Sequence, residues 1–211
     1  ERPVYWLVNK PRGYLCTNHD PAGRPRAIDL VPHVRQRVYT VGRLDEDSEG
    51  LLLLTNDGDL AHRLTHPRFG VEKTYVVQVA GRPSREDVQQ LLKGVWLSDG
   101  HVKARRVKRL RQQGESTWLE IVLNEGKNRE VRRMLARLGH KVMRLKRVAL
   151  GPVHLSRVPT GKARPLTPRE LEMLRRAAGP RPGDQGARRQ GDKGTRRQEE
   201  KEAARLGSLK G

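Results

Sequence analysis

Cysteine and phenylalanine are the scarcest residues of this 211-residue chain, each occurring once. The single cysteine, Cys16, has no partner for an intrachain disulfide, which excludes a disulfide-stabilised secreted domain. No apolar run approaches the roughly 20 residues that a membrane-spanning helix needs, and no signal peptide is visible. We therefore expect a cytoplasmic protein without a membrane partner.

Acidic residues are also few: 24 Asp and Glu stand against 44 Lys and Arg, for a net charge of +20. Residues 180–211 hold nine of the cations and five of the acids, so most of the excess lies in residues 1–179. A surface this positive repels itself unless it faces a polyanion, and nucleic acid is the commonest one. The charge therefore favours a nucleic-acid partner.

Residues 180–211 contain no aromatic residue, no valine and no isoleucine, whereas Arg, Lys, Glu, Gln and Gly dominate them. Such a segment cannot bury enough apolar surface to offset the entropy lost on ordering. We expect one folded domain over residues 1–179, followed by a disordered basic tail over residues 180–211.

Hydrophobic patterning and turn residues predict more strands than helices in the folded part. Strands are expected at residues 4–8, 37–41, 51–54, 74–80, 102–110, 117–123 and 141–150, and helices at residues 59–65, 84–93, 128–138 and 167–178. Because few helices lie between successive strands, the pattern favours an α+β fold on a mixed, mostly antiparallel sheet.

An acidic cluster interrupts the basic sequence, with Asp45, Glu46, Asp47 and Glu49 lying between two apolar strands. A carboxylate beside Arg43 would be kept ionised, as a nucleophile requires. Two alternatives stay open: a solvated acidic turn, which is the commoner explanation of such a run, and a divalent-metal site of a nuclease. The metal site would use Asp45 and Asp47 with Asp57 and Asp59.

A second cluster has the opposite charge: Lys127, Arg129, Arg132 and Arg133 lie at the start of the predicted helix 128–138. The helix macrodipole disfavours cations at this end, so an anion is expected opposite them, either a phosphate or a catalytic carboxylate. A solvated basic face is the alternative. Tyr75, beside Lys73 in a predicted strand, is either a core residue or a stacking platform for an unpaired base.

Four motifs in order give these residues a common setting. Residues 42–58 (Gly-Arg-Leu-Asp through Thr-Asn-Asp-Gly) closely resemble the signature of the bacterial ribosomal RNA pseudouridine synthases of the RsuA/RluB branch. Residues 9–13 (Asn-Lys-Pro-Arg-Gly), 72–75 (Glu-Lys-Thr-Tyr) and 125–134 (Glu-Gly-Lys-Asn-Arg-Glu-Val-Arg-Arg-Met) match further motifs of the same family. The resemblance extends from about Val4 to about Leu174.

This resemblance implies a role for each matching residue. Asp45 matches the essential aspartate, which attacks the ribose or the base of a flipped uridine, and Tyr75 matches the tyrosine that stacks on that base. Arg132 matches the basic residue paired with the aspartate. Further substrate or phosphate contacts are expected from Arg43, Lys10, Lys73, Arg129 and Arg133. No metal or cofactor is expected, because the reaction is an isomerisation.

The resemblance also implies a fold and a partner. The family fold is a mixed, mostly antiparallel sheet with flanking helices and a central active-site cleft, in agreement with the patterning. The loop at residues 20–25 (Asp-Pro-Ala-Gly-Arg-Pro) is most like large-subunit members, so 23S ribosomal RNA is the expected substrate and a monomer the expected state. An S4-type RNA-binding domain usually precedes the catalytic domain, and we expect that it is absent here or was removed. The alternative is a non-catalytic ribosome-assembly factor on the same fold.

Overall fold

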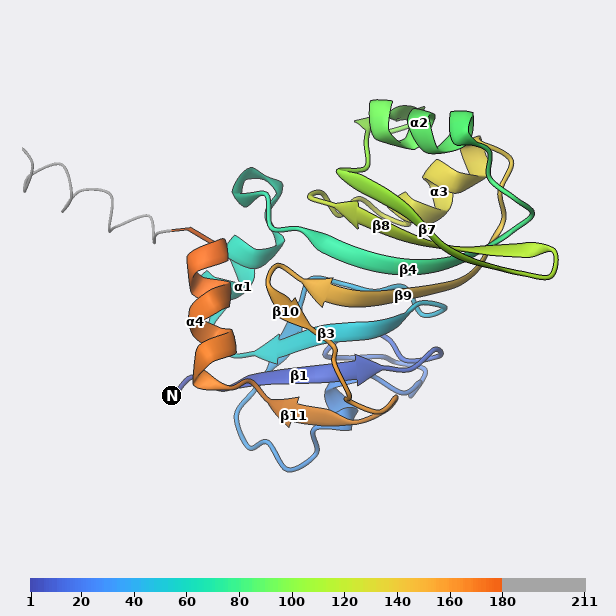
Figure 1. Cartoon of the computed structure of the whole chain (residues 1–211). Coiled ribbons are helices and arrows are strands. Elements are labelled where there is room, and N and C mark those ends of the chain that lie inside the picture. Colours follow the sequence, from blue (N-terminus) through green and yellow to red (C-terminus); the bar gives the residue numbers. More distant parts are fainter. Residues whose placement is uncertain (180–211) are drawn as a thin grey trace, which may run out of the picture. The chain divides into compact units, whose positions relative to one another are not determined.

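A nine-stranded sheet forms the centre of the folded part in the computed structural model, which describes residues 1–179. The main path through the sheet is β11 (Ala163–Pro165), β1 (Tyr5–Lys10), β3 (Glu49–Thr55), β9 (Val142–Leu150), β4 (Lys73–Ala80), β8 (Ser116–Leu123) and β7 (Arg106–Gln113). In addition, β2 (Tyr39–Val41) pairs with β3 and β10 (Val153–His154) with β9. Figure 1 shows this order from β7 at the top to β11 at the bottom.

Only one pair of strands in this sheet, β3 with β9, is parallel; the other pairs are antiparallel. The α+β class and the mixed, mostly antiparallel sheet are thus confirmed. The parallel contact is short, since it joins only Glu49 to Lys146 and Gly50 to Arg147. The predicted tail over residues 180–211 lies outside the described residues.

The four leucines of β3 explain why this strand is central. Side chains alternate between the two faces of a strand, so Leu51 and Leu53 enter one hydrophobic core while Leu52 and Leu54 enter the other. All four are buried. A strand that is apolar on both faces has to be covered on both faces, which places β3 inside the sheet.

Two helices contribute to each core. The core of Leu51 also holds Leu60 and Leu64 of α1 (Gly58–Thr65) and Leu174 of α4 (Pro168–Ala177). The core of Leu52 holds buried residues of α2 (Arg85–Lys93) and α3 (Glu130–Arg137). Side-chain caps define the starts of α2 and α4: Ser84 and Thr167 each accept a hydrogen bond from the third residue of the helix.

Several boundaries differ from the sequence prediction. The strand expected over residues 102–110 is broken into β6 (Gly100–Val102) and β7, because the backbone of the buried Ala104 turns to donate to Leu91. The helix expected from residue 128 begins at Glu130. Short elements escaped prediction: the strands β5 (Val95–Leu97), β10 and β11, and 3-10 helices at Ala27–Leu30 and Pro67–Phe69.

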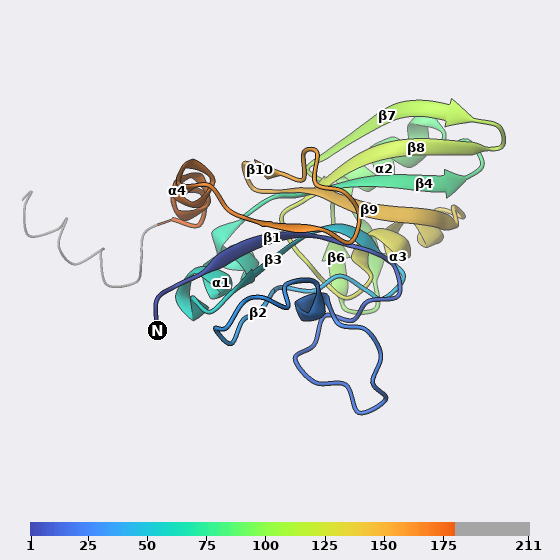
Figure 2. The ribbon, with the colours of Figure 1, turned by 90° about the horizontal axis from the view of Figure 1, so that it is seen from below.

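The connection between β1 and β2 is the longest excursion from the sheet, and Figure 2 shows it extending away from the strands. Among residues 1–179, no helix is long and apolar enough to cross a membrane.

Candidate active site

The acidic loop between β2 and β3 carries Asp45, and a buried lysine holds its backbone. The Lys10 ammonium donates to the carbonyl of Ser48 at 2.8 Å and to that of Pro11 at 2.9 Å, and it lies 3.5 Å from that of Glu46. Gly13 also donates its N–H to Glu46 at 2.8 Å. The motif at residues 9–13 therefore holds the backbone of the acidic loop in place through hydrogen bonds.

Gly50 brings the loop and β3 unusually close to β9. Its φ is +113°, and a Cβ at this position would lie 2.2 Å from the carbonyl oxygen of Arg147. Only glycine allows both the dihedral angle and the approach. The short parallel contact thus places Arg147 directly beside the start of β3.

Arg147 in turn lies opposite Tyr75 of β4, at a break in the strand register. Thr74 pairs with Ala149, but Tyr75 pairs with Arg147, so one residue of β9 is extra. Bulges of this kind re-aim side chains and are frequent near active sites. The bulge sets Tyr75 and Arg147 side by side, and both line the cleft that Asp45 borders.

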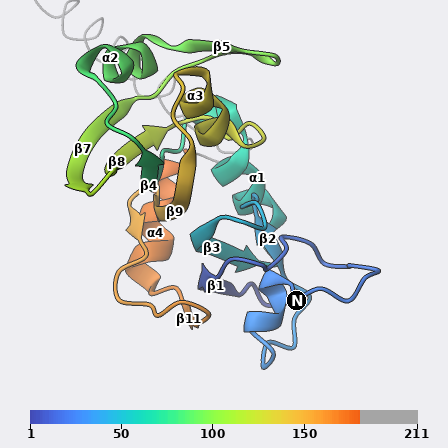
Figure 3. The same ribbon diagram turned by 90° about the vertical axis from the view of Figure 1, so that its right-hand side faces the viewer.

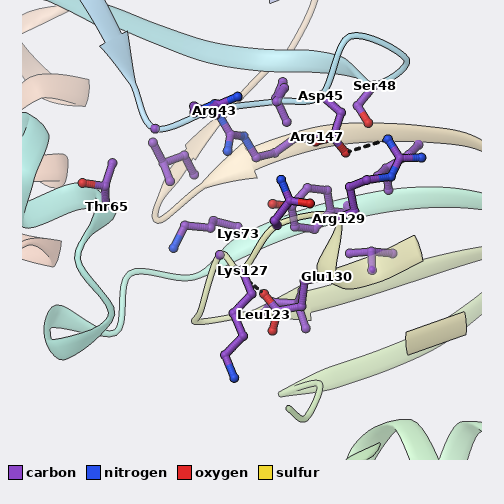
Figure 4. Close-up of a pocket in the computed structure, with 18 of the residues that line it drawn as sticks. Arg43, Asp45, Ser48, Thr65, Lys73, Leu123, Lys127, Arg129, Glu130 and Arg147 are labelled. Carbon is purple, nitrogen blue, oxygen red and sulfur yellow. Dashed lines mark hydrogen bonds and ion pairs between the residues drawn. The ribbon is translucent and has the colours of Figure 1, made fainter. Parts of the chain in front are cut away.

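The cleft has a volume of about 350 Å³, within the range of small-molecule sites. The β2–β3 loop provides Arg43, Asp45 and Ser48, whereas β4 and β9 provide Lys73, Tyr75 and Arg147. The segment before α3 closes the opposite side with Lys127, Asn128 and Arg129. Figure 4 shows the side chains of Asp45, Arg129, Lys73 and Arg147 gathered in this space.

Asp45 is paired with Arg129, across a distance of 3.6 Å between Oδ2 and Nη1 (Figure 4). Its side chain keeps 26% of its surface exposed. The resemblance implied a pair between this aspartate and Arg132, and this detail is corrected: the guanidinium of Arg132 lies 3.2 Å from the carboxylate of Asp47. Arg132 also donates to the backbone oxygen of Asp47 at 3.1 Å.

Arg129 reaches both acids because it precedes α3 in a left-handed conformation, with φ +47°. Its two terminal nitrogens bind the carboxylate of Asp47 at 3.1 and 3.2 Å. Burial of Asp47 opposes ionisation, yet the hydrogen bonds from Arg129 and the charge of Arg132 lower the pKa of this carboxyl. The cations at the start of α3 therefore do face anions, as the macrodipole argument required, and those anions are carboxylates.

Tyr75 is only 8% exposed, so its ring is held firmly in the wall of the cleft. Burial raises the pKa of its phenol, and the charge of Arg147 partly opposes the shift. The phenol is consequently neutral at pH 7, where it can stack or donate a proton in a hydrogen bond.

Lys73 is 6% exposed and donates from Nζ to the carbonyl of Val71 at 3.3 Å. Burial lowers the pKa of its ammonium to about 8, and the nearby charge of Arg147 adds to this shift. Glu130 is buried beside it and accepts the N–H of Lys127 at 2.9 Å. Burial raises the pKa of the Glu130 carboxyl.

The other residues predicted to contact substrate or phosphate do not all line the cleft. Arg43 lines the cleft. Lys10 is completely buried, and loop carbonyls occupy its ammonium, so it has no open path to a phosphate in this structure. Arg133 is paired with Asp99 at 2.8 Å and lies outside the lining of the cleft. Lys10 and Arg133 thus support the walls of the site.

The carboxylates of the nuclease hypothesis are not gathered together. Asp57 caps α1 and accepts the hydroxyl of Tyr5 at 2.7 Å, while Asp59 pairs with Arg63 at 3.1 Å. Among residues 1–179, no group of three or more His, Cys, Asp or Glu side chains could hold a metal ion.

Sequence reasoning missed Arg147. The residue is 3% exposed, its Nε donates to the carbonyl of Leu51 at 2.8 Å, and its Nη2 has no hydrogen-bond partner within the described residues. A buried donor without a partner is uncommon, and a ligand acceptor bound in the cleft would account for it. The sequence offered little signal for it, because the predicted strand also contains Lys141, Arg144 and Lys146.

Comparisons with known proteins show which family has a similar sequence. The RNA pseudouridylate synthase family matches residues 4–137. A "Ribosomal large subunit pseudouridine synthase B" of Bacillus subtilis is 41% identical over 180 residues, covering 84% of this chain and 74% of its own. A "Ribosomal large subunit pseudouridine synthase E" of Xanthomonas campestris is 43% identical over 173 residues, covering 75% of this chain and 92% of its own.

Among experimental structures, a crystal structure of a pseudouridylate synthase superimposes with a TM-score of 0.71 at 32% sequence identity. The similarity covers 83% of this chain and 75% of that one. Sequence and fold therefore lead to the same family.

Proposed function

The chain belongs to the RNA pseudouridylate synthase family, and on that premise we propose that it isomerises a uridine of large-subunit ribosomal RNA to pseudouridine. The observation that carries the proposal is the cleft itself. The carboxylate of Asp45 borders a space of about 350 Å³ together with a neutral tyrosine and a buried arginine. The names of the relatives from Bacillus and Xanthomonas support the choice of RNA.

Asp45 is the nucleophile in this proposal. Its carboxylate forms a bond to either C1′ or C6 of the uridine, the C1′–N1 bond breaks, and a C1′–C5 bond forms after the base has turned. The bond to Asp45 then breaks, which restores the free carboxylate. The proton lost from C5 is balanced by one gained at N1, so substrate and product have the same composition. The reaction balances without a cofactor.

Tyr75 and Arg147 hold the base during the turn. The fixed ring of Tyr75 provides a stacking surface, and its protonated phenol does not act as a strong base. The free Nη2 of Arg147 can donate to a uracil carbonyl. Such a donor would keep the detached base in the cleft while C5 approaches C1′.

The positive charge of residues 1–179 supports the binding step. A base must leave its stack to reach Asp45, which costs a few kcal/mol. Contacts between Lys or Arg side chains and phosphates can offset this cost, and they make binding sensitive to salt. We also propose that the enzyme acts as a monomer in the cytoplasm, where the reduced thiol of Cys16 is expected.

The test is a chemical map of pseudouridine on ribosomal RNA transcripts after incubation with the protein. The wild type is expected to modify one position in 23S RNA, and Asp45→Asn is expected to abolish the product while RNA binding persists. Asp47→Asn is the matched control, because Asp47 is a neighbouring acid that does not line the cleft. It should retain measurable activity, reduced only through the altered setting of Arg129.

A wild type that forms pseudouridine on no ribosomal RNA would refute the proposal and leave only a binding role. Full activity of Asp45→Asn would refute the assignment of the nucleophile. If both acids proved equally essential, the distinction drawn from the cleft would fail.

A further inference from the structure

Trp96 is the most exposed large hydrophobic residue among those described, with 72% of its surface accessible. It lies on the hairpin of β5 and β6, whose Val95 and Val102 are buried in the core. Because side chains alternate along a strand, Trp96 and its cross-strand partner His101 lie on the outer face. The core therefore does not account for a tryptophan at this position.

The outer face is held rigidly. The rings of Trp96 and His101 are 5.1 Å apart at 58°. His101 lies against the backbone of Gly94, where a Cβ would come within 2.3 Å of the imidazole. The imidazole thus supports one side of the indole, while the large exposed surface of Trp96 remains open.

The hairpin is joined to the wall of the cleft. At its tip, Asp99 binds Arg133 of α3 through two hydrogen bonds of 2.8 and 2.9 Å. The backbone oxygen of Asp99 accepts from Lys127, 3.2 Å away, and Lys127 lines the cleft. Figure 3 shows β5 extending beside α2 and above α3. The hairpin that carries Trp96 is therefore tied to a residue of the cleft lining.

The charge around the hairpin suits nucleic acid. Residues 103–111, which follow β6 directly, contain six Lys and Arg and no acid. A cation also lies at the hairpin itself, since the Lys127 ammonium would be 3.4 Å from a Cβ at Gly100. Exposed aromatic rings and cations together bind single-stranded nucleic acid, through stacking on bases and attraction to phosphates.

We propose that Trp96 stacks on an unpaired base of the RNA near the target uridine. The inference rests on the proposed function for the identity of the RNA, whereas the stacking itself does not depend on catalysis. One base would stack on Trp96 outside the cleft while the target base lies inside it. The protein would then hold the RNA strand at two points, with Lys127 between them.

Binding of short oligouridylate is the first measurement, compared with an abasic oligomer that has the same phosphates and no bases. Trp96→Ala is expected to lose affinity for oligouridylate by about tenfold, a typical loss when one base stack is removed. Its affinity for the abasic oligomer should not change. Trp96→Phe keeps an aromatic ring and should stay within about threefold of the wild type.

Met143→Ala serves as the control, since Met143 is another exposed apolar side chain, on β9, without an aromatic face. It should bind both oligomers as the wild type does. Equal losses of Trp96→Ala on both oligomers, or no loss on either, would refute stacking. Because Trp96 is exposed, its truncation is expected to leave thermal unfolding unchanged, which calorimetry can verify.

The pseudouridine map separates the two proposals. If the wild type forms pseudouridine but Trp96→Ala binds oligouridylate normally, the stacking proposal fails and the function stands. If no pseudouridine forms but the oligouridylate difference is seen, the function fails and the stacking surface stands. On a transcript that the wild type converts, Trp96→Ala should raise the half-saturating RNA concentration. Its single-turnover rate at saturating RNA should stay within about twofold of the wild-type rate.

Discussion

Substitution of Gly50 by alanine tests the geometry on which the whole site depends. The methyl group would lie 2.2 Å from the oxygen, 2.8 Å from the nitrogen and 3.0 Å from the carbon of the Arg147 backbone. These atoms belong to a strand and cannot rotate away. A non-glycine residue at φ +113° costs about 1–3 kcal/mol, and forced repacking costs about 1–3 kcal/mol more. Gly50→Ala should therefore lower the free energy of unfolding by about 2–6 kcal/mol.

Urea denaturation measures this difference, and Gly114→Ala provides the control. Gly114 also has a positive φ, +56°, but no atom lies within 4 Å of the place where its Cβ would be. The free energy of unfolding of Gly114→Ala should fall only by the cost of the left-handed conformation, about 1–2 kcal/mol. Equal destabilisation of the two variants would refute the argument that β3 and β9 are in obligatory close contact.

The same substitution should impair catalysis in molecules that remain folded. Separation of β9 from β3 would move Arg147 and Tyr75 away from Asp45, and a displacement of about 1 Å at an active site can cost about 100-fold in rate. Single-turnover assays at a temperature well below the unfolding transition measure this loss. A normal rate in Gly50→Ala would show that the β3–β9 contact does not position the reacting groups.

Two further substitutions test individual side chains of the cleft. Arg147→Met should lower the saturated turnover by about 100-fold and change RNA affinity little, whereas Lys146→Met, one residue earlier on β9, should retain normal turnover; equal effects would deny Arg147 a specific role. Lys73→Met should stabilise the protein at pH 7, because folding lowers the pKa of this ammonium from 10.5 to about 8. Below pH 8 the penalty for burying the charge is complete, roughly 3 kcal/mol, and it is relieved as the pH rises toward 10.5. Urea denaturation of both proteins between pH 7 and pH 10 should show their difference shrinking, and a constant difference would contradict the assigned pKa.

Much of the fold could be predicted because the responsible signals are local. The four leucines of β3 and the caps at Ser84 and Thr167 each act within a few residues. The break at Ala104 could not be seen in this way, since it depends on a hydrogen bond to Leu91 in another element. Short strands such as β11 contain too few residues for any periodicity.

In the candidate site, too, the residues within sequence motifs could be predicted, whereas the features that depend on tertiary contacts could not. Motif order led to Asp45 and Tyr75, which the structure brings to one cleft. Lys10 was expected to contact substrate from the family resemblance, but two of its three carbonyl partners come from a loop 36 to 38 residues away. Arg147 could not be distinguished by sequence from Arg144 and Lys146, the other cations of β9. Its position is defined by the close approach of Gly50 and by the bulge opposite Tyr75, and both are tertiary features.

The acidic run can now be explained residue by residue. Glu49 binds Arg144 at 3.0 Å, and Asp47 is held by Arg129 and Arg132. Glu46 lies 3.9 Å from Arg24, outside the lining of the cleft.

Asp45 differs from these acids because it alone of the four lines the cleft, with a single ion pair of 3.6 Å to Arg129. Asp47 takes the shorter contacts of that arginine, so Arg129 is held in place without fully engaging Asp45. A nucleophile needs a charged form that is stabilised and yet reachable. The neighbouring acids provide this condition: they bind the cations that would otherwise close over Asp45. Removal of Asp47 should accordingly draw Arg129 onto Asp45 and slow the reaction without abolishing it.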